Sequence, residues 1–259
     1  MSATIIAIIL AATLVTAAIS GVFGMAGGLI LMGVLTSVVP VATAMVLHGS
    51  IQIVSNFSRA AFLWKHISWV VVGRYCLGII GAVVLIALVA WRPSGPTVFI
   101  LLGLTAMLVW IPKSWIEINV ERPFQAELCG FLVQTLNTLA GVAGPLLDIF
   151  FVKTLLPRQT VVATKATTQV MAHAVKIAFW GLPLIAVLNN PATAQDAHFP
   201  PLWALGACVP LSLIGTWLGG LVLDRMTDVS FRQWTKWIVT ATGTVYLLRG
   251  FFPQYIQFG

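Results

Sequence analysis

Two stretches of this apolar sequence carry polar side chains at helical spacing. The residues recur at steps of four, four and three: His48, Gln52, Asn56 and Arg59, then Lys165, Gln169, His173 and Lys176. This spacing places each set on a single helical face. A Lys or Arg in the centre of a bilayer costs about 2.5–3.5 kcal/mol on insertion scales, so such residues normally face a cavity or a partner. The two stripes therefore predict a polar pathway between apolar helices.

Each cationic residue of the stripes has a second interpretation. Arg59 and Lys176 lie near the predicted helix ends, where their side chains would reach the lipid headgroups. Lys165 lies about eight residues into its helix and would otherwise pair with Asp148 of the preceding short segment. Asp148 and the two stripe histidines are also candidates for carrying a coupling proton.

Glycine-rich stretches interrupt two apolar runs and precede two short apolar segments. The glycines of interest are Gly24, Gly27 and Gly28 in the stretch 21–28, and Gly141 and Gly144 in the stretch 140–145. A broken helix exposes unpaired backbone N–H groups and the positive end of its dipole, which together form an anion site. The alternative for both stretches is close helix packing, which is our preferred interpretation for the Gly215 to Gly219 pattern.

Composition places these elements in a membrane. The 259 residues are 59% hydrophobic and 8% charged, against about 25% charged residues in an ordinary soluble domain. The 14 basic residues are scattered, so the net charge of +7 does not indicate nucleic acid. The three cysteines lie in apolar runs without metal-ligand spacing, so we expect no disulfide, metal or cofactor. No motif of an enzyme active site is present, and we expect a non-enzyme.

Apolar runs, and the glycine, proline and charged residues that bound them, predict the helices. The spanning candidates are 2–22, 41–64, 67–90, 96–111, 125–140, 158–180, 201–223 and 231–250, and the short pieces are 27–38 and 144–156. Basic residues concentrate in alternate connections and predict that 65–74, 112–124 and 224–236 are cytoplasmic. The connections 91–95 and 182–201 and both termini are then extracytoplasmic.

The two halves of the chain resemble one another. An ungapped shift of 117 residues matches Gly24 with Gly141, Gly27 with Gly144, Pro40 with Pro157, Gln52 with Gln169 and Phe62 with Phe179. Matched glycine, proline and glutamine are harder to obtain by chance than matched leucine. We therefore predict two repeats, 1–124 and 125–259, each with a broken helix followed by three helices. The charge pattern makes the repeats inverted copies.

At these residues the sequence resembles the sulfite exporter TauE/SafE family, whose pattern is a G-x-F-G-x-x-G-G stretch that closes the first helix. Gly21, Phe23, Gly24, Gly27 and Gly28 stand at the expected positions, and the second copy has Pro145 in place of the last glycine. The resemblance implies transport of sulfite, a sulfonate or a similar small sulfur oxyanion. A departure from the pattern is the cluster of Lys165, His173 and Lys176 on one helix.

The combined prediction is an all-α polytopic bundle in the cell (inner) membrane that moves such an anion by alternating access. The anion would bind between the glycine breaks, contacted by the polar stripe residues, with Asp148, Arg59 and Lys176 in coupling or gating. Proton or cation coupling and a homo-oligomer are both compatible with this prediction. The alternatives are a membrane scaffold or assembly protein for a partner complex, and a passive anion channel.

Overall fold

The computed structural model describes residues 1–190, 198–223, 225–226 and 228–254. Ten α-helices account for most of these residues: α1 Ala3–Phe23, α2 Met25–Val38, α3 Val41–Phe62, α4 Trp69–Val89, α5 Gly95–Met107, α6 Gln125–Ala140, α7 Gly144–Phe151, α8 Arg158–Leu188, α9 Leu202–Leu223 and α10 Asp228–Phe251. Single 3₁₀ turns follow α3 and α5, and a further one precedes the connection to α6. Within this described part of the chain the fold is all-helical, as the sequence predicts.

Both glycine stretches interrupt a helix, and in each the helix ends at a glycine with a positive φ. Gly24 ends α1 at φ 63° and Gly141 ends α6 at φ 90°, and each N–H donates to the carbonyl oxygen four residues earlier over 2.9 Å. A positive φ is accessible to glycine without steric cost, which explains the residue type at both ends. Residues 21–23 and 25–28 remain helical, so the first break is narrower than the predicted stretch.

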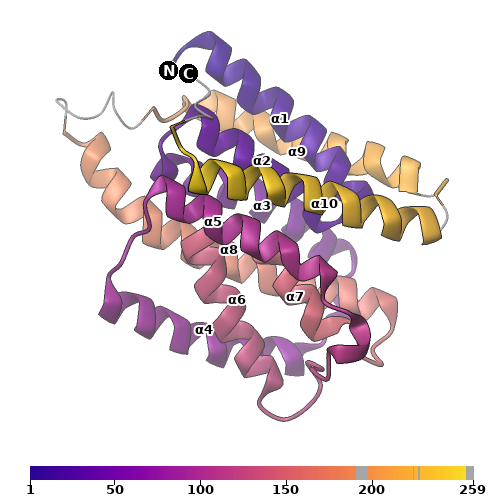
Figure 1. Ribbon diagram of the computed structural model, residues 1–259. Coiled ribbons are helices and arrows are strands. Elements are labelled where there is room, and N and C mark those ends of the chain that lie inside the picture. The colour runs from indigo at the N-terminus through magenta and orange to yellow at the C-terminus, as the bar shows by residue number, and fades with distance from the viewer. Residues whose placement is uncertain (191–197, 224, 227, 255–259) are drawn as a thin grey trace.

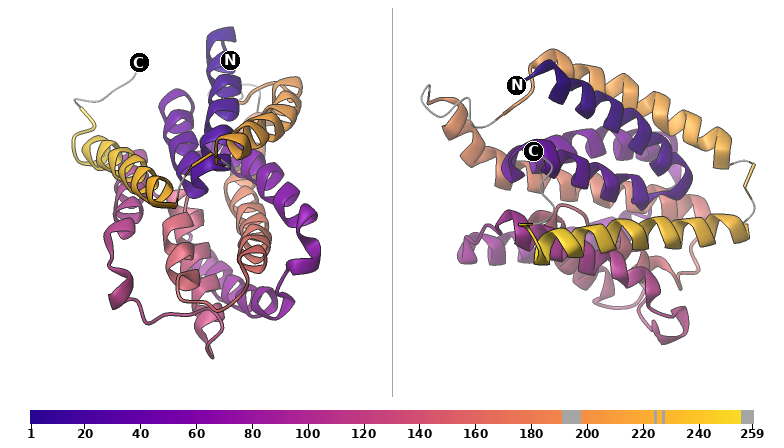
Figure 2. Two further views of the ribbon diagram at one scale, coloured as in Figure 1. Left: turned by 90° about the vertical axis from the view of Figure 1, so that its right-hand side faces the viewer. Right: turned by 45° about the horizontal axis from the view of Figure 1, so that its top comes forward.

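The helices pack in four principal pairs. α1 lies against α9, α3 against α8, α4 against α6 and α5 against α10. Figure 2 shows the same arrangement from two further directions, with α9 beside α1 and α3 beside α8. The α1–α9 pair is close because an added methyl group at Gly215 or Gly219 would overlap the α1 backbone. The interpretation of 215–219 as a packing motif is therefore confirmed.

The longest helix, α8, differs from its predicted extent. It continues to Leu188 through Gly181 and Pro183, whereas the sequence predicts an end at residue 180. Proline is tolerated inside membrane helices because neighbouring groups satisfy the carbonyl that it leaves unpaired. Leu184, one residue further on, is buried in the main hydrophobic core, which favours continued helix. The extension places Lys176 twelve residues from the helix end. The predicted short segments are also adjusted, because α2 begins at Met25 and α7 ends at Phe151.

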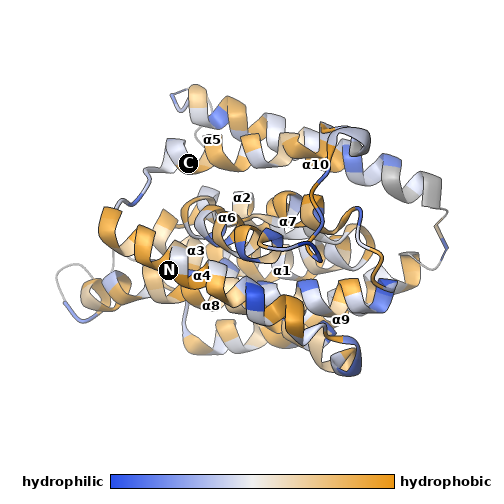
Figure 3. Ribbon diagram, turned by 90° about the horizontal axis from the view of Figure 1, so that it is seen from below, coloured by the Kyte–Doolittle hydropathy of each residue, from blue (hydrophilic) through white to orange (hydrophobic). Residues whose placement is uncertain are grey.

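The surface is apolar, as expected for a protein that faces lipid. Four of the described helices are long and apolar enough to cross a membrane by length and composition: Ala3–Phe23, Trp69–Val89, Arg158–Leu188 and Leu202–Val222. α4 exposes Leu77, Ile80 and Leu88, which are 60–80% accessible. Figure 3 shows hydrophobic residues along the helices and hydrophilic residues in many of the connections. The chain is therefore a multi-pass membrane protein.

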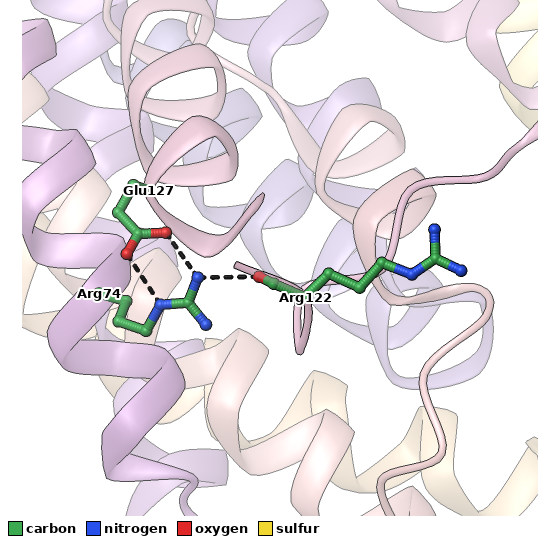
Figure 4. A network of polar contacts seen from close by, with 3 residues as sticks. All are labelled: Arg74, Arg122 and Glu127. Atoms are coloured by element: carbon green, nitrogen blue, oxygen red, sulfur yellow. Dashed lines mark hydrogen bonds and ion pairs between the residues drawn. The ribbon is translucent and has the colours of Figure 1, made fainter. Parts of the chain in front are cut away.

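Basic connections gather at one end of the bundle. The Arg74 guanidinium forms a bidentate ion pair with Glu127, with both N–O distances 2.8 Å, and also donates to the Arg122 carbonyl oxygen over 2.8 Å (Figure 4). Lys236 lies over the Trp110 ring, 3.6 Å from its centroid. These contacts join Arg74 to the connection 112–124 and to the start of α6, and Lys236 to the 3₁₀ turn that follows α5. The N-terminus and the end of α10 lie at the opposite end (Figure 1).

At the same end of the bundle, hydrogen bonds to Glu121 link the connection before α6 to the one after α7. Its Oε2 accepts hydrogen bonds from the Thr154 hydroxyl at 2.6 Å and from the Leu155 N–H at 2.9 Å. These bonds, that of Thr154 first, lower the pKa of the Glu121 carboxyl because they favour its ionised form. The Glu121 side chain is largely exposed, so these two hydrogen bonds contribute modestly to stability.

Candidate functional site

A buried polar bridge joins the two glycine-rich stretches at the centre of the bundle. His48 of α3 places Nε2 2.9 Å from the Gly28 carbonyl oxygen, and its Nδ1 lies 2.8 Å from Lys176 Nζ of α8. Lys176 Nζ also donates to the Gly141 carbonyl oxygen over 2.8 Å. The bridge therefore runs from the first stretch to the second through one residue of each stripe.

The partners of the bridge fix the role of each ring nitrogen of His48. A carbonyl oxygen only accepts, so His48 Nε2 must carry the hydrogen and donate to Gly28. In a neutral ring Nδ1 is then the acceptor, and Lys176 donates to it. An ammonium group has three hydrogens, and these two contacts use two of them.

Burial rules out the headgroup interpretation for Lys176. The side chain is 0% exposed, and His48 is also 0% exposed. The methylene stem packs against α3, because an added methyl group at Gly49 would lie 3.3 Å from Lys176 Cε. A lysine is rarely buried this completely unless it has partners. Here its partners in the described part of the chain are a histidine and a carbonyl oxygen, both of them uncharged acceptors.

A small polar cavity adjoins the first stretch. Gly27 and Gly28 form part of its wall, together with side chains of α1, α3 and α9 that share a hydroxyl or amide group: Thr13, Thr16, Ser20, Gln52, Ser55 and Ser212. An added methyl group at Gly28 would overlap the Gln52 amide nitrogen, so that side chain lies directly against the α2 backbone.

Hydroxyl groups of this first cavity are partly committed to their own helices. The Thr13 hydroxyl donates to the Ile9 carbonyl oxygen over 2.8 Å, and the Thr16 hydroxyl donates to Ala12 over 2.6 Å. These two residues present lone pairs to the cavity and not hydrogens. The hydroxyl hydrogens of Thr13 and Thr16 are therefore not directed at a ligand in the first cavity.

A second polar cluster lies where α6 faces α8, beside the second stretch. Gln134 Nε2 donates to the Thr138 hydroxyl over 2.8 Å and approaches the Ala172 carbonyl oxygen at 3.4 Å. Asn137 and Gln134 are 0% exposed and His173 is 3% exposed. The His173 and His48 rings meet edge to face, with centroids 5.5 Å apart, which connects the cluster to the bridge.

Several of these buried atoms have no hydrogen-bond partner among the described residues. They are both amide atoms of Asn137, the oxygen of Gln134, Nε2 of Gln169 and Nδ1 of His173. Most buried polar atoms in proteins are hydrogen-bonded, so each unpartnered atom calls for an explanation. A ligand or water bound in the cluster would provide one.

The remaining predicted residues lie further from the bridge. Lys165 forms an ion pair with Asp148 of α7, and their side chains are 28% and 37% exposed. This contact matches the alternative interpretation of Lys165. Arg59 is partly buried and donates to the Ser55 hydroxyl over 3.2 Å, and Asn56 donates to the Gln52 carbonyl oxygen over 2.9 Å.

Sequence reasoning missed Gln134 and Asn137. The repeat register contained the signal, because Asn137 matches Ser20 under the 117-residue shift and Ser20 lines the first cavity. Both residues also face inward from a helix whose partner, α8, carries the second stripe. No group of three or more potential metal ligands occurs among the described residues.

A multi-pass helical bundle with interrupted helices and a buried lysine beside unpartnered amides has the architecture of a membrane transporter. The chain matches the family described as sulfite exporter TauE/SafE over residues 8–246 and belongs to that family. Its family is one of membrane transporters for a small anion and not of enzymes. No curated protein and no solved structure matches the chain.

Proposed function

We propose that this protein moves a small sulfur oxyanion, such as sulfite or a sulfonate, across the cell membrane by alternating access. The anion binds near the midplane, between the two helix breaks, and two inverted halves, 1–124 and 125–259, rock around it. The substrate class rests on the family match. The mechanism rests on the contacts described above.

The pattern of helix packing supports two related halves. If α1 to α5 correspond in order to α6 to α10, a two-fold relation turns the α1–α9 pair into α6–α4 and maps α3–α8 and α5–α10 onto themselves. These are the four principal pairs of the fold. The prolines that precede α3 and α8 also share a conformation, with φ −54° in both and ψ 149° and 147°.

The observation that carries the proposal is the bridge between His48 and Lys176. It brings a residue of each stripe, one from each half, into contact with the backbone of both glycine-rich stretches. An anion that replaces or extends one of these contacts would interact with both halves at once. Its binding energy would then depend on how the halves are arranged, which alternating access requires.

The other predicted residues have assigned roles in this proposal. Gly24, Gly27, Gly28, Gly141 and Gly144 shape the breaks, and His48, Gln52, Asn56, Lys165, Gln169 and His173 are polar contacts along the pathway. Asp148 and Arg59 act in coupling or gating, and Lys176 does so through its contact with the anion, with protons carried by Asp148 or the histidines. Both termini face outward, because the basic connections gather at the opposite end.

Flux into proteoliposomes tests the proposal. Saturable uptake of sulfite or methanesulfonate by the purified protein, greater than in empty vesicles, is expected. Uptake that rises linearly with concentration would favour a passive channel instead. Absence of flux, together with a partner that co-purifies in fixed ratio, would favour the scaffold alternative.

A further inference from the structure

We propose that the cluster formed by Gln134, Asn137, Gln169 and His173, beside Lys176, is a binding pocket for an oxyanion that carries a single negative charge. This inference rests on the proposed function and names the site and charge of its substrate. It adds Gln134 and Asn137 of α6 to the site. It also assigns anion binding to this cluster and not to the cavity beside the first stretch.

The cluster concentrates buried polar atoms that have no hydrogen-bond partner among the described residues. Asn137 is 0% exposed and neither of its amide atoms is hydrogen-bonded to a described residue. The Gln134 oxygen, Gln169 Nε2 and His173 Nδ1 share this condition. Buried groups of this kind are normally satisfied. Their concentration on two facing helices indicates a ligand that the polypeptide itself does not supply.

Two pairs of side chains, one on α6 and one on α8, form the cluster. Gln134 and Asn137 are three residues apart on α6, and Gln169 and His173 are four apart on α8, so each pair shares a face and is separated by about one turn or less. The approach of Gln134 Nε2 to the Ala172 carbonyl oxygen places Gln134 beside the residue that precedes His173. Lys176 and Gly141 meet one turn further along.

The charges around the pocket favour a single negative charge on the ligand. Lys165 is balanced by Asp148, and Lys176 has two uncharged acceptors and no carboxylate partner among the described residues. Protonated Lys176 would be balanced by one bound anion of charge minus one. A dianion would leave a second negative charge unpaired in a buried site, which is strongly unfavourable.

Hydrogen-bond chemistry favours the same ligand. Nδ2 of Asn137 and Nε2 of Gln169 donate to oxygens of an oxyanion, whereas the carbonyl oxygens of Asn137 and Gln134 only accept. Sulfate presents oxygens in every direction, so some would face these acceptors. Methanesulfonate can turn its methyl group toward them, and hydrogen sulfite can turn a hydrogen.

Counterflow and uptake in proteoliposomes test the pocket, with methanesulfonate as the monoanion and sulfate as the dianion. Wild-type protein is expected to take up methanesulfonate saturably and to discriminate against sulfate by at least about tenfold. Asn137→Leu and Gln169→Leu should each raise the KM for methanesulfonate about fivefold, the loss of roughly one neutral hydrogen bond. Thr135→Val and Thr167→Val are matched controls on the same helices, because their hydroxyls bond their own helix carbonyls. Both controls should keep the wild-type KM.

Isosteric changes keep the test available if a leucine variant fails to fold. Asn137→Asp keeps the side-chain shape but adds a negative charge, so it should abolish methanesulfonate uptake in protein that remains monodisperse. Equal uptake of sulfate and methanesulfonate would overturn the charge assignment. Wild-type KM values in all Asn137 and Gln169 variants would overturn the pocket while leaving the proposed transport intact. Absence of any oxyanion flux in the wild type would instead remove the proposed function itself.

Discussion

Replacing Lys176 with methionine separates the roles of this residue in anion binding and in folding. Methionine keeps the apolar stem and removes the ammonium group, which donates to His48 and Gly141 over 2.8 Å each. Hydrogen bonds to a charged group contribute about 1.5–3 kcal/mol each. Opposing this loss, removal of a buried charge relieves a desolvation penalty of several kcal/mol. We therefore expect the stability of Lys176→Met to stay within about 2 kcal/mol of wild type.

The loss of anion binding in Lys176→Met is not offset by any such gain. In the proposed pocket the ammonium group of Lys176 contacts the ligand, a contact of about 1.5–3 kcal/mol that corresponds to a roughly 10- to 100-fold rise in KM or Kd. Uptake over a range of methanesulfonate concentrations measures this change, and a thermal unfolding scan in detergent measures stability. Lys176→Arg retains the charge and should be less impaired. Lys65→Met, at an exposed interfacial lysine, is the control. A folded Lys176→Met protein with a KM within about twofold of wild type would refute this account of the site.

Three further predictions concern the surroundings of the site. Asp148→Asn should lower the thermal midpoint more than the double change Asp148→Asn with Lys165→Gln, because the single variant leaves a lysine without its ion-pair partner. Gly27→Ala, where a methyl group would overlap the α1 backbone, should lower the free energy of unfolding by about 1–3 kcal/mol, whereas Gly220→Ala, where nothing lies within 4 Å, should be near neutral. The pKa of Glu121 is lowered in the folded protein, so its ionised carboxyl stabilises the fold at pH values above the pKa that it has in the unfolded chain. This stabilisation is lost as the pH falls through the folded-state pKa. The thermal midpoint should therefore fall less on acidification in Glu121→Gln than in wild type.

Each of these predictions has a clear contrary result. A double variant no more stable than Asp148→Asn would show that loss of the ion pair does not explain the destabilisation. Equal stability of the two alanine variants would contradict the close packing of α1 and α2. An acid-induced shift of the same size in wild type and Glu121→Gln would show that this carboxyl is not a source of the pH dependence.

The sequence alone determined the class of the molecule and most of its helices. Composition and run length are sufficient for this, because lipid admits only apolar spans whose backbone groups are bonded within the helix. The glycine breaks could also be predicted, because glycine favours positions with a positive φ and the 117-residue shift matches the glycines of the two stretches. The stripes were found by their spacing, which depends only on helix periodicity.

Only the tertiary structure decided which of these polar residues meet. Lys176 and His48 are 128 residues apart in the chain, and their contact depends on how α3 packs against α8. The end of α8 was misjudged because proline signals a stop locally, while burial of Leu184 continues the helix. That extension, and not the local sequence, turned a presumed end-of-helix lysine into a buried one. Gln134 and Asn137 acquired significance in the same way, because an unpartnered amide is a property of its surroundings and not of its own residue type.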